Sequence, residues 1–501
     1  MFIKVLVANR GEIACRILRA CKEAGYPAVA VFAANDRGAL FTELATQSVQ
    51  LQGETLAETY LNQEQLLAIA KNTQSTAIHP GFGFLSERAD FAQAVLDAGL
   101  TWIGPSPFAI AKMGDKMTAR QTMRAAGVPV IPGEEVELED EDEAIIALKA
   151  AAQRVGYPLL LKASSGGGGK GMRSVTNPSE FDAAAKAARR EAKAAFGDGR
   201  VYIERLLTSS KHVEIQVLAD QHGRTIHLGE RECSVQRRHQ KVFEEAPGPT
   251  VNASIRDAMG KAAVAAARAV QYVGAGTVEF LLAPTGEFFF LEMNTRIQVE
   301  HPVTEMVTGV DIVREQLRIA QGEPMSCGDL QIRGHAIEVR LYAEDAANNF
   351  LPSIGPLAVF RPPEGPGIRL DTGVREGDEV TPNYDPMLAK LIVWAPSRHE
   401  ALQKMRRALD EFIILGTTTN LRFLRELCDA PAVISGQTTT TTIEECWPAG
   451  WRSSPTGDVL QATVLVAAAA ESWGVHKQAL AQGGSQVGLP NPFVTIQRRL
   501  P

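Results

Sequence analysis

The sequence predicts a multidomain protein that combines α/β and α+β parts. With 501 residues, the chain is too long for one hydrophobic core, so several domains are expected. Up to about residue 112, short apolar runs alternate with helix-like segments, which is the pattern of parallel strands joined by helices. Further along, a glycine-rich run at 164–171 is enclosed by two strand-like segments, and strands dominate after residue 201.

The first predicted domain covers residues 1–112. Residues 2–8 form a continuous apolar run, which is typical of a strand buried on both faces of a parallel sheet. Asn9 is expected to cap the helix that follows, and Gly25 to end it. Because no G-x-G-x-x-G motif follows the first strand, a dinucleotide-binding fold is not indicated. Three further strands are expected, at residues 29–33, 76–79 and 101–104.

Residues 157–175 are predicted to form a strand, a glycine-rich loop and a second strand. The loop is not a Walker A motif, because no Ser or Thr follows Lys170. A flexible linker is the alternative interpretation. Since linkers are rarely flanked by strands on both sides, we favour a mobile hairpin whose backbone N–H groups close on phosphate groups.

A second hairpin is predicted from residues 276–282 and the strand that begins at Phe288, with its turn at Thr285 and Gly286. In this register Glu279 lies directly opposite Glu292, and like charges that face each other across a ladder are destabilising. A shared divalent cation removes this penalty, and carboxylate and amide oxygens suit Mg²⁺ or Mn²⁺. The sequence therefore predicts a metal site.

Polar side chains alternate along the second strand of this hairpin, at Glu292, Asn294, Arg296, Gln298 and Glu300. In an extended chain they lie on one face. A half-buried strand with its polar side in water is the simpler interpretation. This face, however, combines two carboxylates, two amides and a guanidinium group. We therefore add Asn294 to the predicted metal ligands, and we interpret Arg296 as an anion clamp and Glu300 as a base.

Two further groups of cations are candidates for an anion site. Within residues 230–245, four basic side chains lie close together: Arg237, Arg238, His239 and Lys241. Glutamates accompany them and no aromatic residues interleave with them, so a phosphate or bicarbonate site is favoured over a nucleic-acid patch. Arg340 lies among apolar residues in the strand-like run HAIEVRL, where a surface strand residue and a site residue remain equally good interpretations.

Composition argues against several classes of function. The formal net charge of −7 provides no electrostatic footprint for nucleic acid or an anionic membrane. No apolar run approaches the length that spans a membrane. The six cysteines show neither C-x-x-C pairing nor zinc-ligand spacing, so free thiols in a reducing compartment are expected. Because the first strand leaves no room for a signal peptide, we predict a cytoplasmic protein without nucleic-acid or membrane partners.

Five long motifs occur in an order that resembles the biotin carboxylase family of ATP-grasp enzymes, over residues 1 to about 446. They are ANRGEIACRILRA at 8–20, HPGFGFLSE at 79–87, KASSGGGGKGM at 162–172, RECSVQRRHQKVFEEAP at 231–247 and EMNTRIQVEHPVTE at 292–305. The resemblance implies an N-terminal pre-ATP-grasp α/β domain, then an ATP-grasp domain at 113–330 with a mobile glycine-rich lid at about 135–204. It also implies a β-rich C-terminal lobe at 331–446 and a tail at 447–501 that serves as connector or docking segment.

The resemblance also implies roles for individual residues. ATP contacts fall to Lys116, Lys162, Gly168, Gly169, Glu204, Arg205, Leu206, Leu207, His212, Gln236 and His239. Metal binding falls to Glu279, Glu292 and Asn294, and bicarbonate binding to Lys241, Arg296, Gln298 and Val299. Glu300 would deprotonate bicarbonate, and Arg340 would stabilise the biotin enolate and the released phosphate. Phe82 stands where many members have a tyrosine beside bicarbonate and biotin, and the missing hydroxyl group would weaken biotin binding.

The implied activity is ATP- and bicarbonate-dependent carboxylation of biotin on a carrier protein, through carboxyphosphate. This is the first half-reaction of an acetyl-CoA or other acyl-CoA carboxylase, and the sequence leaves the final acceptor open. Another bicarbonate-activating ATP-grasp ligase, such as a carbamoyl-phosphate synthetase-like enzyme, is the alternative among enzymes. A nucleotide-binding regulatory subunit with a decayed site is the alternative outside them.

The expected partners follow from the resemblance and from one missing motif. No Met-Lys-Met, the signature of a biotin-bearing lysine, occurs in the 501 residues. We therefore expect a subunit, or a fragment of a longer chain, that is not itself biotinylated. It would work with a biotin carboxyl carrier protein and carboxyltransferase subunits, with the tail as docking element. Arg16, Arg19 and Glu23 match positions used in the family's subunit dimer, so a homodimer is expected.

Overall fold

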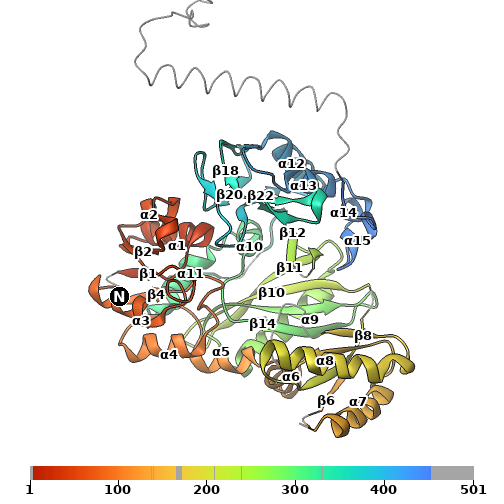
Figure 1. Cartoon of the computed structure of the whole chain (residues 1–501). Helices are drawn as coiled ribbons and strands as arrows, with labels where there is room; N and C mark the ends of the chain where they lie inside the picture. The colour runs from red at the N-terminus through yellow and green to blue at the C-terminus, as the bar shows by residue number, and fades with distance from the viewer. Residues whose placement is uncertain are drawn as a thin grey trace, which may run out of the picture. The chain divides into compact units, whose positions relative to one another are not determined.

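The computed structural model describes residues 4–136, 138, 140–164, 172–207, 209–238, 240–328 and 331–452, and the chain up to Trp451 groups into one compact unit (Figure 1). Three predicted site residues, Gly168, Gly169 and His239, lie outside the described residues, as does the tail from residue 453. Across the described ranges, no helix combines the length and the apolar character needed to cross a bilayer.

The N-terminal domain is a parallel five-stranded sheet in the order β3-β2-β1-β4-β5 (Figure 1, red to orange), as predicted. Successive residues of the first apolar run point to opposite sides: Val5 and Val7 pack into one core, Leu6 and Ala8 into another. The sheet is therefore buried on both faces. Its strands are β1 Val5–Val7, β2 Ala28–Phe32, β3 Gln47–Gln50, β4 Ala77–His79 and β5 Thr101–Trp102, with helices α1 Gly11–Glu23, α2 Leu40–Leu44, α3 Gln63–Asn72, α4 Ala89–Asp97 and α5 Pro107–Gly114.

The predicted cap of α1 by Asn9 is wrong. The residue that precedes the helix is Arg10, and no side chain caps it. The Asn9 side chain instead donates to the carbonyl oxygens of Pro80 at 2.7 Å and Phe82 at 2.8 Å. Strands β1 and β4 are neighbours in the sheet, so the loops at their carboxyl ends lie side by side. The Asn9 amide therefore bonds to the loop after β4. The predicted end of the helix holds, since Gly25 has φ +80°.

A small antiparallel sheet forms the region predicted as the lid. Its order is β6-β9-β7-β8, and two helices contribute to its separate core. The two predicted strands are present and pair with each other, while the predicted glycine-rich loop between them lies outside the described residues at 165–171. The elements are β6 Gly133–Glu135, α7 Glu141–Val155, β7 Leu159–Ala163, β8 Arg173–Val175, α8 Phe181–Phe196 and β9 Val201–Arg205, preceded by α6 Lys116–Ala125.

The largest sheet has eight antiparallel strands in the order β14-β13-β10-β11-β12-β15-β22-β20. It crosses the boundary predicted near residue 330, because β12 pairs with β15. Helix α9 packs on β10 and β11. The strands are β10 Lys211–Ala219, β11 Thr225–Arg237, β12 Gln240–Ala246, β13 Gly274–Leu282, β14 Phe288–Asn294, β15 His335–Tyr342, β20 Ile368–Thr372 and β22 Met387–Ala395; α9 is Ala253–Ala269.

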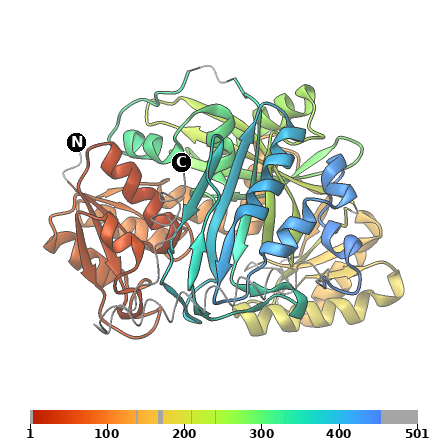
Figure 2. The ribbon, with the colours of Figure 1, turned by 90° about the horizontal axis from the view of Figure 1, so that it is seen from above.

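The C-terminal part surrounds the end of this sheet with short strands and helices. Figure 2 shows the blue helices beside the teal and blue strands, where α12 packs on β22 and β15. The remaining elements are α10 His301–Thr308, α11 Ile312–Ala320, β16 Glu344–Asp345, β17 Leu351–Pro352, β18 Gly355–Pro356, β19 Val359–Arg361, β21 Glu379–Val380, α12 Arg398–Glu411, β23 Ile413–Leu415, α13 Leu421–Leu427, α14 Pro431–Ser435 and α15 Thr442–Cys446.

Candidate active site

One cleft of about 1090 Å³ collects most of the predicted site residues. Its walls come from loops of the N-terminal sheet, from the lid sheet and from the large sheet, including its strand β15. The predicted residues that line it are Phe82, Lys116, Lys162, Leu207, His212, Gln236, Lys241, Glu279, Glu292, Asn294, Arg296, Gln298, Val299, Glu300 and Arg340. Glu204, Arg205 and Leu206 are not part of this lining.

The β13–β14 hairpin has the predicted register. Glu279 lies directly opposite Glu292, and Thr277 lies opposite Asn294. A β-bulge follows Glu279, because the next pair is Phe280 with Phe290. The bulge adds one residue on β14 and locally re-aims the side chains there, as bulges beside active sites commonly do.

The strand ends at Asn294, so the predicted extended face through Glu300 is wrong. The chain turns after Asn294, and Glu87 of the HPGFGFLSE motif holds the turn. Its carboxylate accepts from the Thr295 amide at 3.2 Å and from Arg296 Nε at 2.9 Å. Because of this contact with the N-terminal domain, Arg296, Gln298 and Glu300 still line the same cleft.

Lys241 is the centre of a buried charge cluster. Its Nζ donates to Glu214 at 2.6 Å, to Glu279 at 2.9 Å and to Glu300 at 2.6 Å. These carboxylates raise the pKa of Lys241 well above its usual value, against the opposing effect of burial. Lys241 therefore stays protonated and ties the predicted metal ligand Glu279 to the predicted base Glu300.

Arg340 lines the cleft, so the interpretation as a surface strand residue is wrong. The residue is 8% exposed. Nε donates to Glu244 at 2.6 Å and Nη2 to Glu300 at 2.9 Å. Desolvation raises the pKa of Glu300, but Lys241, Arg340 and Arg231 lower it by more, so the carboxyl pKa lies well below its ordinary value.

Arg231 supports this cluster from behind and is completely buried. It donates to Glu214 at 2.5 Å and to Gln298 Oε1 at 2.7 Å. Gln298 in turn donates to Glu279 at 2.8 Å. The orientation of the Gln298 amide is thus set by a cation on one side and a carboxylate on the other.

At the lid side of the cleft, two lysines face the nucleotide-binding region implied by the sequence. Lys162, in β7, forms an ion pair with Glu204 at 2.5 Å, and Glu204 also pairs with Arg120. Lys116 begins α6, and burial together with the charge of Lys162 lowers its pKa, while Glu292 and Glu204 raise it. Glu204 therefore lies behind Lys162 and orients it.

Phe82 lines the cleft at the carboxyl end of the parallel sheet. The Asn9 amide holds its carbonyl oxygen at 2.8 Å. A Cβ at the preceding Gly81 would meet the Asn9 side-chain nitrogen at 2.9 Å, so the loop requires glycine there. Nearby, Arg10 stacks on the ring of Tyr384, 3.7 Å from its centroid.

The residues of the hairpin fit a divalent cation. Within the described part of the chain, no ion pair involves Glu292, and its carboxylate opens into the cleft. Desolvation and the charge of Glu279 both raise the pKa of Glu292. Asn294 Nδ2 donates to Glu279 at 2.9 Å, which places an amide beside the two carboxylates. Repulsion between hard oxygen ligands is what a bound Mg²⁺ or Mn²⁺ relieves.

Several residues of the site were missed by the sequence reasoning. They are Glu87, Glu214, Arg231, Glu244 and Lys390. One signal was available, because Glu214 alternates with His212 and Gln216 between apolar residues of the same strand. The others have their partners on distant elements, so spacing within the sequence carries no signal for them.

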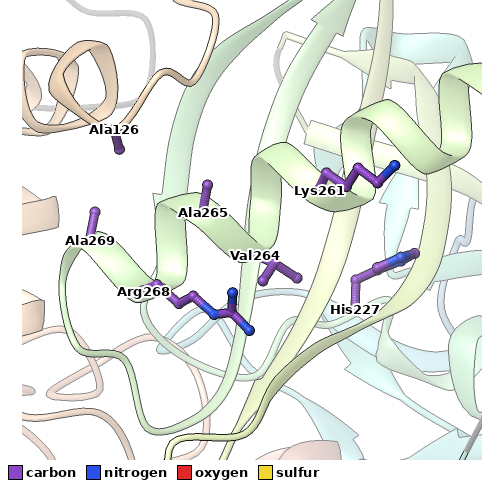
Figure 3. A pocket seen from close by; sticks show the side chains of 7 residues that line it. All are labelled: Ala126, His227, Lys261, Val264, Ala265, Arg268 and Ala269. Carbon is purple, nitrogen blue, oxygen red and sulfur yellow. The ribbon is translucent and has the colours of Figure 1, made fainter.

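A second hollow, of about 700 Å³, lies along α9, away from every predicted site residue. Figure 3 shows Lys261, Arg268 and His227 around it, together with alanines of α9. Lys261 pairs with Asp257 on its own helix at 2.7 Å. Among the described residues that line this hollow, none carries a carboxylate, so we assign the chemistry to the larger cleft.

Arg16, expected at a subunit interface, is largely buried and pairs within the chain. Nη2 donates to Glu305 at 3.0 Å and to Asp311 at 2.6 Å. Glu23 is exposed on the same helix.

The small lid sheet, the large antiparallel sheet and the lysines and carboxylates between them define an ATP-grasp enzyme. Three family models match the chain. They are "Biotin carboxylase, N-terminal domain" over residues 1–110, "Carbamoyl-phosphate synthase L chain, ATP binding domain" over 115–327 and "Biotin carboxylase C-terminal domain" over 338–445. The chain thus belongs to the biotin carboxylase family, and it is a ligase of that family.

Curated relatives agree with this assignment. The chain is 49% identical over 446 residues to biotin carboxylase from Nostoc sp., covering 89% of this chain and 99% of the relative. It is 50% identical over 445 residues to methylcrotonoyl-CoA carboxylase subunit alpha from Oryza sativa, covering 88% of this chain but 60% of that longer protein. It is also 45% identical to the propionyl-CoA carboxylase alpha chain of Ruegeria pomeroyi, covering 96% of this chain and 72% of that longer protein.

Solved structures are similar over the same region. The biotin carboxylase from Campylobacter jejuni matches with a TM-score of 0.85 and 41% identity, covering 89% of this chain and 99% of that one. The biotin carboxylase domain dimer of Hydrogenobacter thermophilus 2-oxoglutarate carboxylase, with ADP, magnesium and bicarbonate, matches with a TM-score of 0.84 and 44% identity, covering 89% and 98%.

Proposed function

We propose that this chain carboxylates biotin with bicarbonate and ATP, through carboxyphosphate, in the cleft described above. Mg²⁺ or Mn²⁺ would be held by Glu279, Glu292 and Asn294, and would neutralise charge on the ATP phosphates. Lys116 and Lys162 would contact the same phosphates. The observation that carries the proposal is the Glu300 carboxylate, held between two cations at 2.6 Å and 2.9 Å.

Glu300 would take the proton of bicarbonate. In the structure its low pKa makes it a weak base, because Lys241 and Arg340 both donate to it. An anion that enters beside these cations competes for them and restores basicity to the carboxylate. Bicarbonate would therefore be bound by Lys241, Arg296, Gln298 and the Val299 backbone. Its binding would raise the pKa of Glu300, so that Glu300 can accept the bicarbonate proton.

Arg340 would serve the second step, in which biotin accepts the carboxyl group. Its guanidinium group is tied to Glu244 at one nitrogen and to Glu300 at another. A fixed cation at this position would stabilise the biotin enolate and the departing phosphate without reorganisation. Phe82 would supply an apolar wall for biotin.

The remaining predicted ATP contacts divide by position. Leu207, His212 and Gln236 line the cleft, where adenine and ribose contacts are proposed for them. His212 also contacts the Glu279 carboxylate at 2.7 Å. When a metal binds Glu279, the His212 ring would either move away or keep this contact beside the metal. For Glu204 we propose an indirect role, because it holds Lys162.

The acceptor after biotin is proposed as acetyl-CoA or another acyl-CoA. Similar chains include subunits named for methylcrotonoyl-CoA, propionyl-CoA and pyruvate carboxylases, and the first two of these relatives are longer than this chain. The proposed partners are a biotin carboxyl carrier protein and a carboxyltransferase. A homodimer is proposed by similarity to the Hydrogenobacter dimer, and the cytoplasmic location stays a prediction.

The test is an assay of ADP and phosphate release with bicarbonate and free biotin added separately and together. We expect ATP cleavage that requires bicarbonate and rises with biotin, with carboxybiotin as product. Carbamoyl phosphate formed from ammonia in place of carboxybiotin would favour the carbamoyl-phosphate synthetase-like alternative. Nucleotide binding without any cleavage would favour the regulatory alternative.

A further inference from the structure

Glu338, in the middle of β15, is a buried carboxyl group without a visible partner. Its side chain has no exposed surface. Among the described residues, neither Oε1 nor Oε2 has a hydrogen-bond partner. An ionised carboxylate without a partner in this setting is strongly disfavoured, because burial removes its hydration.

The residue directly opposite Glu338 is another glutamate. The β12–β15 register pairs Glu338 with Glu244, so the two side chains rise from the same face of the sheet. Glu244 is also fully buried. One of its oxygens accepts from Arg340 Nε at 2.6 Å, and the other, Oε2, has no partner in the described structure. On this face of two neighbouring strands, three buried carboxyl oxygens therefore lack a donor among the described residues.

The cations nearby do not supply that donor. Lys390, opposite Arg340 on β22, directs its Nζ to the Val299 carbonyl at 2.8 Å and to Glu12 at 3.2 Å. Arg340 donates from Nε to Glu244 and from Nη2 to Glu300. The charged and titratable groups that face or flank Glu338 are Glu244, Arg340, Lys390 and Glu300, with Glu12, Asp371, Arg369 and His301 around Lys390.

We propose that Glu338 and Glu244 share one proton, with the Glu338 hydroxyl donating to Glu244 Oε2, and that this pair positions Arg340. One proton turns one Glu338 oxygen into a donor for Glu244 Oε2, and the other Glu338 oxygen becomes an uncharged carbonyl oxygen. It also leaves Glu244 with the negative charge that Arg340 needs. Glu338 is thus a positioning residue that acts through Glu244, and its effect on the reaction rests on the role proposed for Arg340.

The electrostatics agree with this arrangement. Burial raises the pKa of Glu338 well above its ordinary value, since Lys390 lowers it by less and Glu244 raises it further. Burial also raises the pKa of Glu244 to about 7, with Arg340 opposing and Glu300 adding to the shift. Both carboxyl groups of a close pair cannot easily ionise together, so they titrate as a unit.

The neighbouring Glu245 provides a matched control. It is equally buried and belongs to the same strand, but points away from the pair. His335 and Arg398 each contact it at 2.7 Å, and these hydrogen bonds lower its pKa despite burial. Glu245 is therefore ionised, and its replacement removes a carboxylate but no protonated carboxyl group.

The first experiment detects the proton without any activity. Infrared spectra of the full chain near neutral pH are compared for wild type, Glu338→Gln and Glu245→Gln, in the carbonyl-stretch region of protonated carboxyl groups. We expect wild type to have a band that shifts in deuterated buffer, is lost in Glu338→Gln and is kept in Glu245→Gln. Identical spectra of wild type and Glu338→Gln would overturn the proposal, because Glu338 would then be ionised.

The second experiment reads out the positioning of Arg340. The Glu338→Gln variant keeps an N–H donor for Glu244, so it should retain biotin-dependent turnover within a few-fold. Glu338→Leu removes the donor and should lower this turnover about 10- to 100-fold, which corresponds to the loss of a hydrogen bond to a charged group. The KM for ATP and the biotin-independent ATP cleavage of Glu338→Leu should change little.

The outcomes separate this inference from the proposed function. Equal biotin-dependent turnover in Glu338→Leu and wild type would refute the positioning role. If Glu338→Leu does not fold, the biotin-dependent turnover and the infrared spectrum of Glu338→Gln still test the proposal. If wild type cleaves no ATP with bicarbonate, the proposed function fails, while the infrared comparison continues to test whether the proton is present.

Discussion

Replacing Glu300 by glutamine removes the proposed base while keeping the shape of the side chain. Glu300 is 2% exposed and accepts from Lys241 at 2.6 Å and from Arg340 at 2.9 Å. A glutamine has one acceptor oxygen, so it satisfies one of these cations and turns its N–H₂ group toward the other. We expect bicarbonate-dependent ATP cleavage to fall about 10²- to 10⁴-fold, which is the usual contribution of a general base.

In energy, this loss is about 3–5 kcal/mol of transition-state stabilisation. Binding of ATP should change little, because Lys116 and Lys162 meet the cleft from α6 and β7, and Lys162 has its own partner in Glu204 at 2.5 Å. The assay measures phosphate release at saturating bicarbonate, and nucleotide affinity by fluorescence titration with an ATP analogue.

Glu245→Gln is the control, since this buried carboxylate also contacts two basic side chains but lies outside the cleft lining. It should lower the free energy of unfolding and leave the rate within a few-fold. A Glu300→Gln enzyme with a rate near that of wild type would refute the base assignment. A loss of equal size in Glu245→Gln would mean that the effect is structural.

Four further predictions concern other parts of the site and the fold. Arg340→Ala and Arg296→Ala should spare ATP binding and abolish carboxybiotin formation, and an unchanged carboxybiotin yield would remove that residue from the site. Phe82→Tyr should lower the KM for free biotin, and an unchanged or higher KM would contradict the proposed contact. Glu292→Gln should raise the Mg²⁺ concentration needed for half-maximal activity, and an unchanged requirement would move the metal elsewhere. Burial lowers the pKa of His79 from 6.5 to about 3, so the unfolded chain takes up a proton that the native protein excludes. The free energy of unfolding should fall as the pH drops from 6.5 toward 3, by about 1.4 kcal/mol per pH unit from this group. Urea unfolding of His79→Gln should show a shallower dependence, and an unchanged one would mean that His79 is protonated in the native state.

Local patterns in the sequence predicted the parts of this protein that depend on near neighbours in the chain. The register that sets Glu279 against Glu292 follows from a short turn and from alternation on either side of it, and the structure confirms it. The parallel N-terminal sheet follows in the same way from apolar runs separated by helices. The resemblance of five motifs added the family, which the comparisons confirm.

Tertiary structure decided which charges meet. Asn9 leaves its expected cap because β4 brings Pro80 and Phe82 within reach. The polar face predicted through Glu300 is not a strand, since Glu87 from another domain holds the turn after Asn294. Glu338 and Glu244 belong to strands far apart in sequence, and they become a pair through the register of β12 with β15. The physical reason is that a strand's own sequence determines which side chains share a face. The ion pairs across that face depend on which distant strand lies alongside and on how much water the packed layers exclude.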